Sequence, residues 1–420
     1  MLLRRLALIM VVAVDMCCQG MMFPLFNELI NDPASGFYSA EVSGGARQFS
    51  YGVLLAVFYL FWFFGAAYIS RLSDFIGRKK GITICLGGAF IGYVLTIVGI
   101  LTKDYWVLLL SRAIAGFTAG NQPIAQAAFV DISRSDDERS RNLGLFMVGV
   151  SVGLVGGPLL AGLFGSPEVL GPYASLWLPF AFAAGLVLLT WLLVEVAFRE
   201  PRPASSKIAV SLVDVVTNLL RLRHRPTVVK ISLVFFFVQM GQNFLFIYVA
   251  NYLTQRFDFS TFHNSIVLVV LGVAMCTGGL VVAPLIARLG KIRLVAGGAA
   301  LVAVTELAFL LNPVADLSYV LVFPPIALLS IMYPTMLALY SESVGPDEQG
   351  WVMGITVAMF TSGCAIISFS GGLLMGISYY LPIVAGILSA LIGMGFMLAF
   401  GRQNDVRALE TSGLNERDGG

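Results

Sequence analysis

The chain has 420 residues, of which 58% are hydrophobic and only 12% are charged. Soluble domains are about a quarter charged, so this composition argues against a soluble enzyme, a nucleic-acid-binding protein or a disordered scaffold. The net charge of +2 indicates no charged partner. The 44 glycines are typical of helical membrane proteins, in which small residues let helices approach closely. These numbers predict an all-α membrane protein.

Neither cysteine nor histidine is arranged for a metal, redox or catalytic centre. The two histidines lie far apart, and the five cysteines fall in apolar stretches without metal-ligand spacing. The sequence also has no phosphate-binding loop and no nucleophile constellation. We therefore expect no metal site, no cofactor and no enzyme activity. The residues concerned are His224, His263, Cys17, Cys18, Cys85, Cys276 and Cys364.

The first apolar stretch could be mistaken for a secretory signal peptide. Arg4 and Arg5 precede an apolar run, as they would in such a peptide. However, Asp15 interrupts the run, no small-residue cleavage site follows, and the apolar character resumes through Phe26. We therefore predict a retained first helix.

Twelve apolar stretches follow one another, each long enough to cross a bilayer as a helix of about 20 residues. They are predicted at 6–30, 50–69, 82–102, 105–131, 143–165, 175–197, 228–253, 263–286, 294–311, 318–341, 351–376 and 379–400. We expect these twelve transmembrane helices to form two pseudo-symmetric six-helix bundles.

Basic residues indicate the orientation, because cytoplasmic loops are enriched in Lys and Arg. With twelve spans both termini face the same side. That side holds 22 of the 26 Lys and Arg, and the opposite side holds only 3. Both termini are therefore predicted to be cytoplasmic, in a bacterial-type inner (plasma) membrane.

The predicted domain organisation has four parts, namely an N-terminal bundle at 1–197, a cytoplasmic linker at 198–227, a C-terminal bundle at 228–400 and a cytoplasmic tail at 401–420. Apolar residues recur at helical spacing in the linker, which predicts a basic amphipathic helix on the inner membrane surface. The alternative of a simple connector stays open. The apolar residues are Ile208, Leu212, Val215, Leu219 and Leu220.

The two halves contain similar glycine patterns at an offset of 210 residues. Gly144 and Gly153 in the fifth span correspond to Gly354 and Gly363 in the eleventh. Two similar six-span halves are typical of a duplicated transporter with a site near the middle of the membrane.

The loop after the second span is a tight connection in which Gly77 permits the turn and Asp74 can pair with Arg78. With Leu72 and Lys79, these residues resemble the loop motif of the major facilitator superfamily, although Ser70 replaces its leading glycine. In members of this superfamily, that glycine lets the second span approach the eleventh span. The serine at position 70 therefore affects the contact expected between these two spans. An ordinary basic cytoplasmic loop is the alternative.

The fourth span resembles the same superfamily. Arg112 and Gly116 match its Arg-x-x-x-Gly pattern, and Asp131 lies at the inner end of the span. In the family, the loop acid, the loop arginine and the acid of the fourth span form a charge network that latches the outward-open state. The resemblance assigns this conformational latch to Asp74, Arg78 and Asp131, with Gly77 at the turn.

The fifth span resembles the antiporter motif of drug–proton exchangers, with one alanine in place of a glycine. Small residues give it a smooth face and a proline permits a bend. The first and seventh spans are similar to the tetracycline-efflux group, on Asp15, Gly20 and Pro24 and on residues 235–242. The antiporter motif comprises Gly144, Gly153, Gly157, Pro158 and Gly162.

Three charged residues lie well inside predicted spans, away from the span ends, where such residues usually have a function. We expect Asp15 and Arg112 to share a central cavity and to couple transport to protons, or alternatively to form a permanent structural ion pair. Glu306 in the ninth span is the third coupling candidate, and it could instead snorkel or pair structurally.

Amide and aromatic side chains mark the predicted substrate path and suit a mixed polar and apolar organic molecule. Hydrogen bonding between helices is the alternative role for the amides. The candidates are Gln19, Asn121, Gln122, Gln126, Gln239, Gln242, Asn243, Phe244 and Tyr248.

Together these patterns predict a proton-coupled secondary transporter that works by alternating access. Export of a small organic molecule by drug–proton antiport is the favoured direction, and import of a metabolite or siderophore is the alternative. The expected partners are the small organic substrate, protons and the lipid bilayer. We expect a monomer that does not bind nucleic acid.

Overall fold

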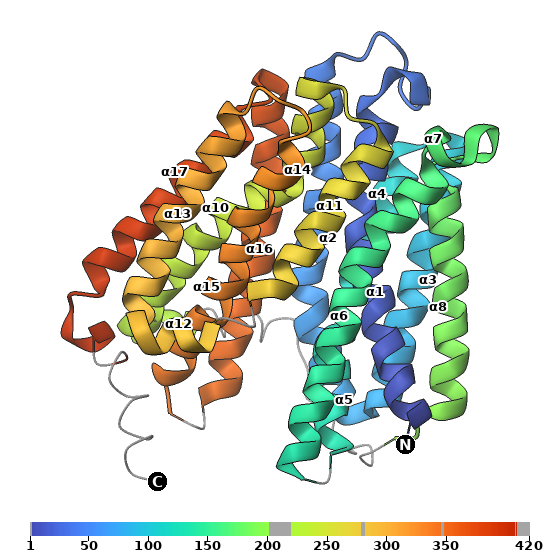
Figure 1. Ribbon diagram of the computed structural model, residues 1–420. Coiled ribbons are helices and arrows are strands. Elements are labelled where there is room, and N and C mark those ends of the chain that lie inside the picture. The colour runs from blue at the N-terminus through green and yellow to red at the C-terminus, as the bar shows by residue number, and fades with distance from the viewer. Residues whose placement is uncertain are drawn as a thin grey trace. The chain divides into compact units, whose positions relative to one another are not determined.

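The computed structural model describes residues 2–133, 135–200, 220–278, 282–345, 348–407 and 409. All the regular structure in these ranges is helical, which confirms the all-α prediction (Figure 1). The chain divides into unit 1, comprising Met1–Val215 and Leu253–Val269, and unit 2, comprising Val216–Tyr252 and Val270–Gly420. Residues 201–219, which hold most of the predicted linker helix, and most of the predicted tail lie outside the described residues.

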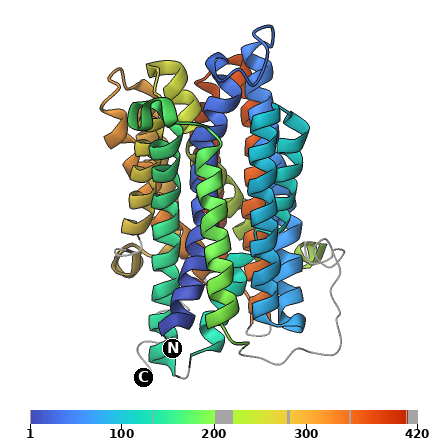
Figure 2. The ribbon, with the colours of Figure 1, turned by 90° about the vertical axis from the view of Figure 1, so that its right-hand side faces the viewer.

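Eight α-helices belong to the N-terminal part of unit 1 within its described residues. They are α1 (Leu2–Asn31), α2 (Gly44–Ile76), α3 (Arg78–Thr102), α4 (Tyr105–Phe117), α5 (Asn121–Asp131), α6 (Asp136–Gly165), α7 (Pro167–Leu170) and α8 (Leu178–Ala197). Helix α1 packs against both α6 and α8, and α3 packs against α4 and α8 (Figures 1 and 2). Short 3₁₀ helices, η1 (Pro33–Ser35) and η2 (Gly171–Tyr173), lie in connections.

The described remainder of the chain contains eight further α-helices and η3 (Arg221–His224). The α-helices are α10 (Pro226–Phe257), α11 (Thr261–Gly278), α12 (Val282–Leu289), α13 (Lys291–Leu311), α14 (Ser318–Leu321), α15 (Phe323–Glu342), α16 (Gln349–Ile377) and α17 (Leu381–Phe400). In unit 2, α13 packs against α15 and α17.

Ten helices in the described ranges are long and apolar enough to cross a membrane. Helix α11 is a shorter apolar helix, and the predicted span at 105–131 is divided into α4 and α5. The single fourth helix is therefore a wrong prediction. The break follows Thr118, whose hydroxyl donates to the Ile114 carbonyl at 2.8 Å, and Pro123 lacks an N–H to continue an upstream helix. The count of twelve spans stays a prediction.

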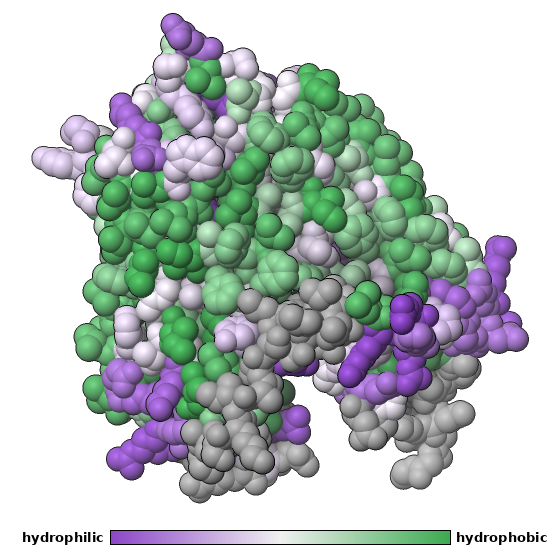
Figure 3. Space-filling view, turned by 180° about the vertical axis from the view of Figure 1, so that it is seen from behind, coloured by the Kyte–Doolittle hydropathy of each residue, from purple (hydrophilic) through white to green (hydrophobic). Residues whose placement is uncertain are grey.

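The outer surfaces of these helices are apolar, unlike those of a soluble protein. On α3, Ile84, Ile91, Val94, Val98 and Leu101 are exposed and recur along one face. Figure 3 shows hydrophobic residues over the middle of unit 1, on the left, with hydrophilic residues gathered at both ends. Such a surface is suited to lipid contact.

Glycines of α6 and of α16 lie against another helix of the same unit. In unit 1 a Cβ added to Gly153 of α6 would collide with the backbone of α1. In unit 2 a Cβ added to Gly371 of α16 would collide with Tyr248 of α10, and one on Gly363 would lie 3.5 Å from Phe236. Gly371 therefore gives room to the Tyr248 ring of α10, whereas Gly153 lets the backbone of α6 approach that of α1.

Candidate functional site

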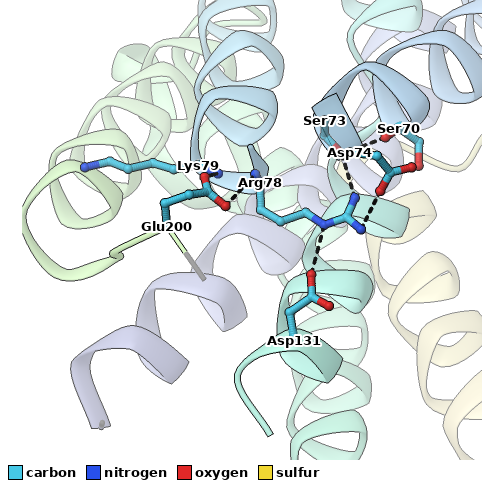
Figure 4. Close-up of polar contacts among 7 residues, drawn as sticks. All are labelled: Ser70, Ser73, Asp74, Arg78, Lys79, Asp131 and Glu200. Atoms are coloured by element: carbon cyan, nitrogen blue, oxygen red, sulfur yellow. Dashed lines mark hydrogen bonds and ion pairs between the residues drawn. The ribbon is translucent and has the colours of Figure 1, made fainter. Parts of the chain in front are cut away.

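A buried arginine at the start of α3 joins two carboxylates (Figure 4). Arg78 Nη2 lies 2.6 Å from Asp74 Oδ1, and its Nε lies 3.2 Å from Asp131 Oδ2 at the end of α5. The Asp131 side chain is only 3% exposed, whereas that of Asp74 is 51% exposed. Gly77 makes the turn at φ +99°, which favours glycine. The structure thus brings together all four residues of the predicted latch.

Glu200 is a further member of this cluster, and no sequence motif indicated it. The backbone N–H groups of Arg78 and Lys79 donate to its two carboxylate oxygens at 3.0 and 2.9 Å (Figure 4). These N–H groups lie in the first turn of α3, where no helical carbonyl is available to them. A carboxylate is also favoured there by the helix dipole. Glu200, in the segment after α8, therefore holds the start of α3 through these two hydrogen bonds.

Unit 2 has a counterpart of this cluster. Gly290 has φ +77° and is followed by Lys291 at the start of α13. Lys291 Nζ lies 2.6 Å from Glu342 Oε1 at the end of α15, and it donates to the Leu409 carbonyl at 3.0 Å. The same helix positions therefore carry a buried cation in both units, paired with an acid at the end of a neighbouring helix.

The antiporter-like glycines of α6 form a seam with α1. Added Cβ atoms on Gly153 and Gly157 would collide with the carbonyl oxygens of Ala13 and Cys17. These two contacts lie on either side of Asp15 along α1, so the seam fixes the segment that carries its carboxyl group.

Other members of the motif have different surroundings. A Cβ on Gly20 of α1 would lie 2.6 Å from Pro158 Cδ, which extends the seam. A Cβ on Gly162 would lie 2.9 Å from Ser265 Cβ, within unit 1. Gly144 has nothing within 4 Å of its added Cβ and so takes no part in this packing.

A cavity in unit 1 brings together several predicted site residues. Asp15 and Gln19 of α1 line it with Arg112 of α4 and Asn121 at the start of α5. Phe58 of α2 contributes an aromatic wall. Each of the four polar residues has one buried atom for which the described part of the chain offers no hydrogen-bond partner, namely Asp15 Oδ2, Gln19 Nε2, Arg112 Nη1 and Asn121 Oδ1. Buried polar groups normally have partners, so this cavity is suited to hold a polar molecule.

Arg112 is completely buried and is held by neutral groups. Its Nη2 donates to Thr96 Oγ1 at 2.7 Å, and its Nε donates to Ser111 Oγ at 3.3 Å. The guanidinium carbon lies 5.1 Å from the centre of the Phe26 ring. The described residues place no carboxylate within 4 Å of it, so the alternative of a permanent ion pair with Asp15 does not describe this arrangement.

Glu306 lies inside unit 2 and does not snorkel to an end of its helix. It is fully buried on α13, and neither carboxylate oxygen has a hydrogen-bond partner among the residues that the structure describes. A Cβ on Gly386 of α17 would lie 3.2 Å from its Oε2, so the side chain faces that helix. An ionised carboxylate is costly in such surroundings.

The remaining substrate candidates differ in their contacts. Gln122 donates to the Met16 sulfur at 2.8 Å, and Gln126 is exposed rather than lining the cavity. In unit 2, Gln242 donates to the Pro325 carbonyl at 3.1 Å and the Tyr248 hydroxyl donates to the Ser368 carbonyl. These two contacts between helices match the structural alternative.

The remaining candidates of unit 2 are buried on α10. Asn243 donates to the Gln239 carbonyl at 2.8 Å, one turn earlier in the same helix, and Phe244 is 3% exposed.

The family follows from comparison of the whole chain with known proteins. Residues 8–368 match the sequence profile of the Major Facilitator Superfamily. The chain belongs to this superfamily. It is therefore a transporter rather than an enzyme, and a multi-pass membrane protein.

Superfamily members with curated functions include several tetracycline resistance proteins. The class C protein of Escherichia coli is 28% identical over 375 residues, which cover 88% of this chain and 87% of that protein. The class D protein of Salmonella ordonez is 27% identical over 318 residues, covering 74% and 75%. The resemblance to the tetracycline-efflux group is thereby confirmed.

Solved structures support the same fold. The human organic anion transporter MFSD10 aligns with a TM-score of 0.67 at 19% identity, over 97% of this chain and 99% of that one. A D-xylose–proton symporter aligns with a TM-score of 0.71 at 16% identity, over 93% and 96%.

The superfamily motifs identified one side of each interaction but seldom its partner. Glu200 is separated from Arg78 by 122 positions, and its only local signal is an acid at the exit of a predicted span. Thr96 and Phe26, which hold Arg112, are ordinary members of apolar stretches. Their roles depend on which helices pack together.

Proposed function

We propose that this superfamily member is a proton-coupled secondary transporter that exports a small organic molecule by alternating access. The principal support is the cavity that Asp15 and Arg112 line together. The glycine seam beside Asp15 and the curated relatives named as tetracycline resistance proteins favour drug–proton antiport. Asp15 is the proton-binding group in this proposal, and Glu306 is a second one.

The membrane arrangement is part of the proposal. Helices α4 and α5 together form the fourth span, and α11 with α12 forms the eighth, which gives twelve spans in two bundles. Both termini then lie in the cytoplasm of a cell with a bacterial-type inner membrane, by the distribution of basic residues. The protein acts as a monomer, and the Asp74–Arg78–Asp131 cluster fastens the cytoplasmic ends of α2, α3 and α5.

The coupling role is tested with Asp15→Asn, which removes the titrating group but keeps its shape. In vesicles, this variant should lose transport driven by a pH gradient and should keep substrate exchange without a gradient. Asp316→Asn, at an exposed loop position, is the matched control. Gradient-driven transport at the wild-type rate in Asp15→Asn would contradict the proposal.

The direction of transport is tested in cells that lack their major efflux pumps. Expression should protect these cells from toxic organic compounds, including tetracycline, and should not rescue growth on a siderophore as the iron source. Growth rescue without protection would instead favour import of a metabolite or siderophore.

A further inference from the structure

We propose that the unit 1 cavity binds one water molecule, which joins the Asp15 carboxylate of α1 to the Arg112 guanidinium of α4. The role of this water in proton coupling rests on the proposed transport function, because it explains how the charge of Asp15 reaches a second helix. Gln19 and Asn121, two of the predicted substrate residues, are then positioning residues that hold the water.

The size of the cavity matches one water. The space open to the centre of a water molecule is about 20 Å³. A single buried water needs at least about 10–15 Å³ on this measure, together with two to four polar partners. The cavity therefore has room for one water and is too small for an organic substrate.

The unused hydrogen-bonding atoms around the cavity match a water in kind and in number. Two donors and two acceptors have no partner among the described residues, namely Arg112 Nη1, Gln19 Nε2, Asp15 Oδ2 and Asn121 Oδ1. A water molecule can accept two hydrogen bonds and donate two, and buried waters make up to four. The Tyr93 hydroxyl also lines the cavity, and it has the Cys18 thiol beside it. One water can therefore satisfy all four of the remaining atoms.

The separation of the two charged groups also indicates a bridging molecule. Within the described ranges no carboxylate lies within 4 Å of the Arg112 guanidinium, although Asp15 lines the same cavity. Polar groups this far apart are commonly joined by one water, which is nearly as favourable as a direct hydrogen bond. A buried charge is costly unless hydrogen bonds and an opposite charge compensate for it. The water supplies a further hydrogen bond to Arg112 and connects it to the negative group.

Packing holds the partners of this water in place before it binds. Gly153 and Gly157 of α6 fix the α1 segment on either side of Asp15. Arg112 is fully buried, and the hydroxyls of its neighbours orient it. Asn121 is 1% exposed, and its side chain lies within hydrogen-bonding reach of Asp15. The water site is therefore preformed.

Hydrogen-bond counting then links the site to the proton. An ionised carboxylate only accepts hydrogen bonds, whereas a protonated one also donates. A proton on Asp15 Oδ2 therefore presents the water with three donors, although it can accept from only two. One of the four hydrogen bonds is lost, and α1 is held less tightly to α4. In the part of the chain that the structure describes, the titratable groups around Asp15 are Arg112, Cys18, Tyr93 and Cys85, of which Arg112 is charged.

The test is infrared difference spectroscopy of the full-length protein in lipid nanodiscs, recorded as the buffer is taken from alkaline to acid pH. A bound water gives an O–H stretching band that shifts in water enriched with the heavy oxygen isotope. We expect such a band to change together with the carboxyl band of Asp15, and Asp15→Asn should lose both changes. Gln19→Leu should keep the carboxyl band and should shift or remove the water band, because one donor is gone. Gln126→Leu, at an exposed position outside the cavity, is the matched control and should keep both bands.

The wild-type spectrum alone can refute the inference, even if a variant does not fold. No isotope-sensitive band accompanying the Asp15 carboxyl band, or an unchanged water band in Gln19→Leu, would overturn the water site. Loss of gradient-driven transport in Asp15→Asn without an isotope-sensitive band in the wild type would reject the water site alone. The expected water band together with gradient-driven transport in Asp15→Asn would reject the coupling proposal alone.

Discussion

Asp131→Asn should destabilise the protein much more than Asp74→Asn, although both aspartates pair with Arg78. The Asp131 carboxylate is 3% exposed, and Asp74 is 51% exposed. Removing one partner of a buried ion pair costs about 3–5 kcal/mol, whereas an exposed pair contributes about 0–1 kcal/mol. We expect Asp131→Asn to lower the free energy of unfolding by about 3 kcal/mol, the lower end of the range for buried pairs. The loss is not larger because Asp74 and the Ser73 hydroxyl still contact the guanidinium.

The assay is reversible unfolding of the full chain in mixed detergent micelles, followed by circular dichroism. A loss of about 3 kcal/mol lowers the equilibrium constant for folding by about two orders of magnitude, which such a titration resolves. Asp74→Asn should shift the curve by about 1 kcal/mol or less. A double-mutant cycle that combines each change with Arg78→Gln measures the interaction energy between that aspartate and Arg78. Equal decreases in the free energy of unfolding for Asp131→Asn and Asp74→Asn would show that burial does not determine how much each ion pair contributes to stability.

Three further changes test other parts of the structure. Gly157→Ala should lower transport and stability because its Cβ would collide with the α1 backbone, whereas Gly144→Ala, with open space around it, should behave as wild type in the same transport assay. Glu200→Ala should lower the free energy of unfolding by about 1 kcal/mol, because it removes the carboxylate at the start of α3, and Glu200→Gln should lower it less. An unchanged free energy of unfolding in Glu200→Ala would contradict the capping role. Glu342→Gln should cost about 3 kcal/mol by leaving its buried lysine partner unpaired, and an unchanged unfolding curve would show that this pair contributes little.

The clusters at the starts of α3 and α13 suggest why both units keep a positive residue after a left-handed glycine. The glycine turns the chain between two helices, and the next side chain then points toward the end of a third helix, where an acid meets it. In unit 1 Glu200 adds a contact from the segment after α8, and in unit 2 the Leu409 carbonyl adds one from the segment after α17. Each cluster therefore connects the ends of several helices through one cation.

The sequence by itself determined the helical membrane architecture, because apolar length and the placement of charge are local properties of the chain. It also identified Asp15 and Arg112, since ionisable residues are conspicuous within apolar stretches. The loop residues Asp74 and Arg78 could be paired from the sequence, because they lie on either side of the turn that Gly77 makes between α2 and α3.

Only the tertiary structure decided which distant groups meet. Glu200 and Glu342 are bound to partners far along the chain, and no local pattern records those distances. The structure also places Asp15 and Arg112 in one cavity without an ion pair between them, whereas the sequence had left a permanent ion pair open as the alternative. Glycine contacts of a few ångströms set how closely α1 approaches α6, and therefore where the Asp15 carboxyl group lies. Such distances arise from side-chain packing between helices, which the order of residues along one helix does not specify.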